Sequence, residues 1–99
     1  MSRVVKCAHI QASNAKYDGT PAEIKEAMIK KHIPFIEEAG KKKVNILCLQ
    51  EIFYGPYFCA EQDIKWYQNA EPVPGPTTER LAEYAKKYQM VMIIPVYEM

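Results

Sequence analysis

The stretch that decides the fold is Leu47-Cys48-Leu49-Gln50-Glu51-Ile52-Phe53-Tyr54-Gly55-Pro56-Tyr57-Phe58, where an apolar run ends on a carboxylate and continues into an aromatic loop. A continuous apolar run of this kind is typical of a buried parallel strand. In open α/β sheets, ligands bind just beyond the carboxyl ends of such strands. Glu51 occupies such an end, so it is either a functional carboxylate or a structural one that caps the strand or pairs with a lysine.

The segment before this stretch predicts a strand and then a helix. Residues 3–12 are apolar and β-branched at their start, as in a first strand. Thr20, Pro21 and Glu23 then form a helix-start signal, with a threonine N-cap, a proline in the first turn and a glutamate that closes a capping box.

The predicted end of this helix depends on two residues. We expect the helix to run to about Ala39, with Gly40 as a left-handed stop. Pro34 lies inside the helical pattern, where proline removes one backbone hydrogen bond and clashes with the carbonyl four residues earlier. The sequence therefore predicts a kink or a break near Lys30.

The remaining segments repeat the alternation of strand and helix. Residues 44–49 predict a second strand, parallel to the first after a right-handed crossover. Residues 53–76 form a long loop with at most a short helical turn around 60–67, and loops of this length in small domains are usually functional or disordered. A helix over 76–89 and a third strand over 90–96 follow. The fold class is therefore α/β with a parallel sheet.

The amino-acid composition limits the classes of partner that the protein can be expected to bind. The chain has 99 residues, 48% hydrophobic and 25% charged, with a net charge of +1. That balance is typical of a globular domain, and it predicts neither a nucleic-acid partner nor a membrane partner. The three cysteines, Cys7, Cys48 and Cys59, have no metal-ligand or redox-motif spacing, which indicates reduced thiols and a cytoplasmic protein.

Other candidate residues have structural explanations. Cys59 is flanked by Phe58, Ala60 and Glu61, and these neighbours favour loop packing over an activated nucleophile. His9 stands alone in an apolar strand, where a packed core histidine is more common than a metal ligand. The aromatic residues of the long loop have acidic neighbours, so a pocket lining or an interface is favoured over nucleic-acid stacking.

Three segments together carry a family resemblance: 49–59 (LQEIFYGPYFC), 71–78 (EPVPGPTT) and 91–98 (VMIIPVYE). The chain resembles the amino-terminal third of the nitrilase superfamily of carbon-nitrogen hydrolases, and is most similar to the beta-ureidopropionase and N-carbamoyl amidase branch. The resemblance implies that residues 1–99 are the amino-terminal portion of a single hydrolase domain. It further implies that they form part of a four-layer α-β-β-α sandwich.

The resemblance also implies roles for individual residues. Glu51 matches the glutamate of a Glu-Lys-Cys triad and would be the general base, which takes the thiol proton and later activates water. Phe53, Tyr54 and Tyr57 would wall the substrate pocket and bury Glu51. No cofactor and no metal are implied. The triad's lysine and cysteine lie downstream of Met99, so the 99-residue chain alone is expected to be inactive.

The implied partners are a small amide or N-carbamoyl substrate and further copies of the chain. An isolated segment of this fold would leave an apolar sheet face uncovered, which favours a homo-oligomer or a larger polypeptide. Two other hypotheses remain at this point. The chain is a non-catalytic α/β association module, or it is a small flavodoxin-like ligand-binding domain, although no phosphate-binding loop supports the latter.

Overall fold

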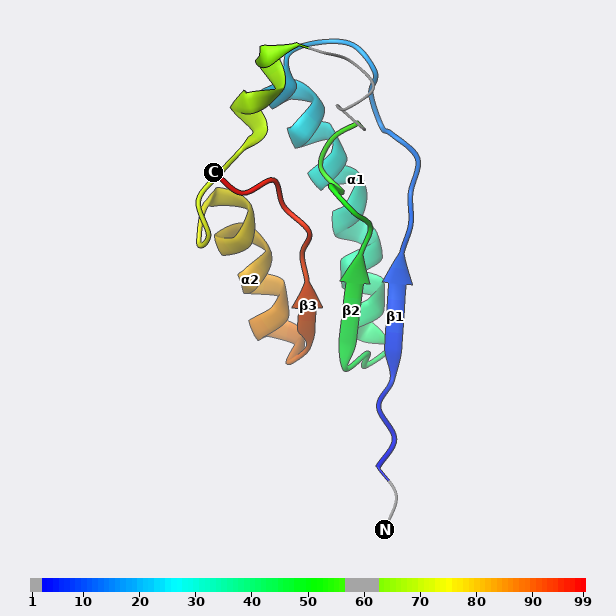
Figure 1. Ribbon diagram of the computed structural model, residues 1–99. Helices are drawn as coiled ribbons and strands as arrows, with labels where there is room; N and C mark the ends of the chain where they lie inside the picture. Colours follow the sequence, from blue (N-terminus) through cyan, green and yellow to red (C-terminus); the bar gives the residue numbers. More distant parts are fainter. Residues whose placement is uncertain (1–2, 57–62) are drawn as a thin grey trace.

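The computed structural model describes residues 3–56 and 63–99, and Figure 1 shows their arrangement. Two residues discussed above, Tyr57 and Cys59, lie outside the described part. The elements follow the predicted alternation in the order β1 (Cys7–Ile10), α1 (Pro21–Lys41), β2 (Ile46–Leu49), the 3-10 helix η2 (Ile64–Asn69), α2 (Pro76–Tyr88) and β3 (Val91–Ile93).

The three strands form one sheet in the order β1-β2-β3, and both pairs are parallel. This confirms the predicted α/β class and the parallel sheet. Each strand is shorter than predicted, because residues beyond the paired segment continue without a strand partner in the described structure. The carboxyl ends of all three strands point toward the same edge of the sheet, where the following loops gather (Figure 1).

The start of α1 is as predicted. The Thr20 hydroxyl accepts a hydrogen bond of 3.2 Å from the backbone N–H of Glu23, and Pro21 opens the helix. This bond satisfies one of the amide groups that a helix start otherwise leaves without a partner.

The predicted end of α1 was wrong. Gly40 lies inside the helix and is buried, and the left-handed residue is Lys43, with φ 58°. Gly40 is required for packing instead, because a Cβ atom there would lie 2.2 Å from Cγ of the Tyr88 ring. The glycine therefore allows the end of α2 to approach the backbone of α1 closely.

Pro34 does not break α1, which is continuous from Pro21 to Lys41. Its ring lies on the exposed side of the helix. The predicted break near Lys30 was therefore wrong. Burial of the opposite face, which includes Met28 and Ile36, stabilises the helix across the missing hydrogen bond.

The two faces of the sheet differ sharply. The strand register places Ala8, Leu47 and Met92 side by side on one face, and these residues pack into the core with α1 and α2. The alternate residues form the other face, which we call the open face: Cys7, His9, Ile46, Cys48, Val91 and Ile93. Val91 is 61% exposed and Ile93 is 50% exposed. In the described part of the chain, the helices thus cover only one face of the sheet.

Within residues 3–56 and 63–99, neither α1 nor α2 combines the length and the apolar character that crossing a bilayer requires.

Candidate active site

Glu51 lies two residues after Leu49, the last residue of β2, and begins a tight turn at the edge where the strand ends gather. Its side chain is exposed and borders a cavity of about 260 Å³. The cavity is lined by residues from the turn and by Asn14 of the loop that follows β1, namely Asn14, Gln50, Glu51, Ile52 and Gly55. Glu51 therefore lies where parallel α/β sheets usually bind ligands.

The surroundings of Glu51 test whether its carboxylate has a structural role, as a partner of a lysine, instead of a functional one. Across residues 3–56 and 63–99, no lysine, arginine or histidine forms an ion pair with the Glu51 carboxylate. The simplest structural role considered for this residue, pairing with a surface lysine, is thus not observed in the described part of the chain.

Ile52 gives the turn an unusual backbone. Its φ is 45°, in the left-handed region that β-branched residues rarely adopt. Holding a residue in such a region costs on the order of 1–3 kcal/mol, so neighbouring contacts must enforce it. The turn that carries Glu51 is therefore held in shape by the structure around it rather than by local preference.

Phe53 and Tyr54 provide contacts of this kind, because both side chains are fully buried in the core. The Phe53 ring meets the buried His32 ring edge-on, with 5.2 Å between centroids, and lies 5.4 Å from the Tyr54 ring. Glu51 itself is exposed, so its expected burial behind Phe53 and Tyr54 is not observed among the described residues. Their assignment to a substrate pocket stays a prediction, as does that of Tyr57.

The Tyr54 hydroxyl ties the turn to two distant segments. It donates a hydrogen bond of 2.9 Å to the backbone carbonyl of Asn69 and accepts one of 2.7 Å from the backbone N–H of Tyr97. Burial raises the pKa of Tyr54 most strongly, and the nearby Glu71 carboxylate raises it further. The hydroxyl therefore stays protonated and keeps its donor role well above neutral pH.

Gln50 fixes the other side of the turn. Its side-chain carbonyl accepts a hydrogen bond of 2.5 Å from the backbone N–H of Ala12, in the loop after β1. Before Glu51 in the chain, Gln50 is thus bound to the loop after β1. After Glu51, Phe53 and Tyr54 are buried in the core.

A second group of polar residues lies beneath Tyr54 and was missed by the sequence analysis. The buried Glu71 carboxylate pairs with Lys25 of α1 and accepts hydrogen bonds of 2.9 Å from the Thr77 N–H and 2.8 Å from the Thr77 hydroxyl. Lys25 Nζ also lies 4.3 Å from the Tyr54 ring centroid. Burial alone would raise the pKa of Glu71, but the hydrogen bonds from Lys25 and Thr77 outweigh it and hold that pKa below its usual value.

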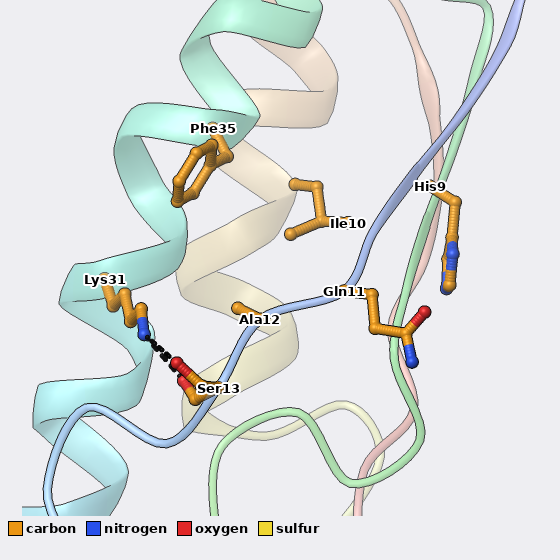
Figure 2. Close-up of a pocket in the computed structure, with 7 residues that line it drawn as sticks. All are labelled: His9, Ile10, Gln11, Ala12, Ser13, Lys31 and Phe35. Carbon is orange, nitrogen blue, oxygen red and sulfur yellow. Dashed lines mark hydrogen bonds between the residues drawn. The ribbon is translucent and has the colours of Figure 1, made fainter.

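The environments of the two histidines were not predicted correctly from the sequence. His9 is exposed on the open face, so its predicted role as a packed core residue was wrong. A cavity of about 470 Å³ lies beside β1. Figure 2 shows Ile10 on the side of the strand that faces α1 and His9 on the other side. His32, which drew no attention in the sequence, is fully buried and its Nδ1 hydrogen-bonds the Met28 carbonyl at 2.7 Å.

The sequence of the chain is similar to those of known hydrolases. Residues 6–99 match the family model described as Carbon-nitrogen hydrolase. The chain is 40% identical over 97 residues to a beta-ureidopropionase of Arabidopsis thaliana, covering 97% of this chain and 24% of that protein. It is 41% identical over 64 residues to an N-carbamoylputrescine amidase of Oryza sativa subsp. japonica, covering 64% and 21% respectively. The chain thus spans about a quarter of the length of these curated relatives.

Proposed function

Since the chain belongs to the carbon-nitrogen hydrolase family, we propose that it is the amino-terminal portion of a single hydrolase domain in which Glu51 is the general base. The position of Glu51 carries this proposal: an exposed carboxylate beside a cavity, at the carboxyl end of a central parallel strand. No cofactor or metal enters the proposed chemistry.

In the proposed mechanism, Glu51 takes the proton from a cysteine thiol, and the thiolate attacks the amide or carbamoyl carbon of the substrate. A lysine stabilises the oxyanion that forms on the former carbonyl oxygen. As the carbon-nitrogen bond breaks, Glu51 passes that proton to the leaving amine. The Glu51 carboxylate then activates the water that hydrolyses the enzyme-bound thioester or thiocarbamate. The family resemblance assigns the lysine and the cysteine to strand ends downstream of residue 99. Residues 1–99 would supply the base and one wall of the site.

The proposed substrates are small N-carbamoyl compounds or linear amides. The support is the similarity to a beta-ureidopropionase and to an N-carbamoylputrescine amidase, whose names describe carbamoyl substrates. The cavity beside Glu51, about 260 Å³, is slightly smaller than the pockets of roughly 300–1,000 Å³ that hold drug-sized ligands, which fits a compact substrate. Proton transfer by a carboxylate is most effective in a site closed to water. We therefore expect further protein to cover this cavity. The complete domain would be a four-layer sandwich, and the enzyme would be cytoplasmic.

A Glu51→Gln variant tests the assignment. The polypeptide that the open reading frame encodes is assayed for amine release from 3-ureidopropionate and from N-carbamoylputrescine. Because glutamine keeps the shape but cannot take a proton, kcat should fall by about 100-fold or more, with an unchanged circular dichroism spectrum. The exposed Glu98→Gln is the matched control and should keep full turnover. Turnover retained by Glu51→Gln, or absent from the unmodified polypeptide on both substrates, would contradict the proposal.

A non-catalytic association module is the second candidate, favoured by one observation. The open face exposes Val91 and Ile93, a surface that proteins usually cover. An unmodified polypeptide that forms a defined oligomer but cleaves neither substrate would favour this reading over the hydrolase.

A further inference from the structure

We propose that Tyr54 is a positioning residue, whose hydroxyl holds the turn that aims the Glu51 carboxylate into its cavity. The inference rests on the proposed function, because aiming Glu51 affects a reaction only if Glu51 is the base. Tyr54 is fully buried and does not line the cavity beside Glu51, so it would not touch a substrate there. It acts through the backbone of the turn.

The need for such a residue comes from Ile52. The left-handed conformation at φ 45° is unfavourable for a β-branched residue, so Ile52 keeps it only while neighbouring contacts hold it there. Within the turn itself, the N–H of Gly55 donates to the Ile52 carbonyl at 3.4 Å, which is long for a hydrogen bond. This single long bond does not account for the left-handed conformation. The direction of the Glu51 side chain follows from that conformation, because the two residues are adjacent.

The Tyr54 hydroxyl supplies the missing constraint. Its hydrogen bonds, to the carbonyl of Asn69 and with the backbone N–H and carbonyl of Tyr97, join the turn to the end of η2 and to the chain after β3. These bonds are buried or partly buried, where a polar group that loses its partner is strongly destabilised. A rotation of Ile52 out of the left-handed region would pull the hydroxyl away from both partners at once.

A Tyr54→Phe variant isolates this role, since it removes the hydroxyl and keeps the ring that contacts Phe53 and Lys25. Tyr88→Phe, at the carboxyl end of α2, is the matched control. The first measurement is amide hydrogen exchange of the chain. In Tyr54→Phe, the amides of Gly55 and Tyr97 should both exchange about tenfold faster, and in the control neither should change. Faster exchange at Tyr97 alone would overturn the inference, because it would show only the lost acceptor and not a released turn.

The second measurement is turnover by the polypeptide that the open reading frame encodes. Tyr54→Phe should lower kcat about tenfold and change KM less than twofold, because a misaimed base weakens the reaction more than binding. Adding Ile52→Asn should restore part of the lost kcat, because asparagine adopts the left-handed region more readily than isoleucine does. A structural role alone would lower the melting temperature without this rescue.

Glu51→Gln, measured in parallel, separates the two proposals. If Glu51→Gln is inactive and Tyr54→Phe turns over like the unmodified polypeptide, the positioning role is wrong and the base assignment stands. If Glu51→Gln keeps its activity, the base assignment is wrong. The exchange result then decides only whether Tyr54 holds the turn, and the proposed catalytic consequence is overturned.

Discussion

Lys25 of α1 and Glu71, at the start of the segment leading into α2, form an ion pair although they are 46 positions apart in the sequence. Their side chains are 18% and 4% exposed. Pairs shielded from water in this way differ from surface pairs, because removal of one partner leaves the other charge without compensation. The pair joins three parts of the fold, since Glu71 also binds the start of α2 and Lys25 lies over Tyr54.

Replacing Glu71 with glutamine should therefore destabilise the chain. We expect Glu71→Gln to lower the free energy of unfolding by about 3 kcal/mol, measured by urea denaturation. Lys25→Met should also destabilise, and the double variant should lose less than the sum of the two single losses. Glu79→Gln, an exposed change in the same helix region, is the control and should have little effect. Strictly additive losses would show that the pair contributes nothing as a pair.

Stability should also depend on pH through Glu71. Its pKa in the folded chain is lower than the ordinary value of 4.5, so folding favours the charged form. The resulting stability is fully present above pH 4.5 and is lost as the pH falls through the folded pKa. Urea titrations below pH 5 should show this decline, and Glu71→Gln should flatten it.

A second carboxylate contributes to the same pH range and needs a control. The hydrogen bond from Arg80 lowers the pKa of Glu26, but this pair is largely exposed. Salt at about 0.5 M should screen the Glu26 contribution while leaving most of the Glu71 contribution in place. A decline that disappears entirely in salt would contradict the assignment to Glu71.

Gly40→Ala should destabilise the folded chain, although helices usually prefer alanine to glycine. The new Cβ would lie 2.2–2.5 Å from three atoms of the Tyr88 ring, and overpacking typically costs about 1–3 kcal/mol. The measurement is the free energy of unfolding, repeated in a Tyr88→Ala background where the ring is absent. There the sign should reverse, with Gly40→Ala stabilising by about 0.5–1 kcal/mol. The same loss in both backgrounds would show that the ring contact is not its cause.

The open face should cause self-association of the 99-residue chain. Val91 is 61% exposed and Ile93 is 50% exposed, and both lie on β3, an edge strand of the described sheet. Sedimentation velocity should show concentration-dependent species larger than a monomer. Val91→Thr with Ile93→Thr, which keeps the strand preference, should shift the distribution toward monomer, and Ile64→Thr, exposed in η2, should not. A monomeric unmodified chain with a cooperative thermal transition would contradict this prediction.

The sequence predicted the features that depend on neighbouring residues. The helix start at Thr20 was confirmed because its hydrogen bond spans three residues, and the parallel sheet followed from the alternation of strand and helix patterns. The end of α1 at Gly40 was predicted wrongly, because the reason for glycine there is the ring of Tyr88, 48 positions later in the printed sequence.

The candidate site was predicted only in part for the same reason. The place of Glu51 at a strand end can be inferred from the apolar run before it, and the structure puts it beside a cavity. The left-handed Ile52 and the Lys25–Glu71 pair depend on contacts between segments far apart in the sequence. No local pattern around Lys25 distinguishes it from the exposed lysines of α1. Such residues are found only when the packed chain is known.

The contact between Tyr54 and Tyr97 has a consequence for the order of folding. The two residues are 43 positions apart, and Glu71 pairs with the same terminal segment through backbone bonds to Tyr97 and Met99. Contacts of long sequence separation form only after the intervening chain has been closed into a loop. During synthesis, the turn at Ile52 therefore reaches its final shape only after α2 and β3 have left the ribosome. Until then, Glu51 lies on a turn that lacks the hydrogen bond between Tyr54 and Tyr97.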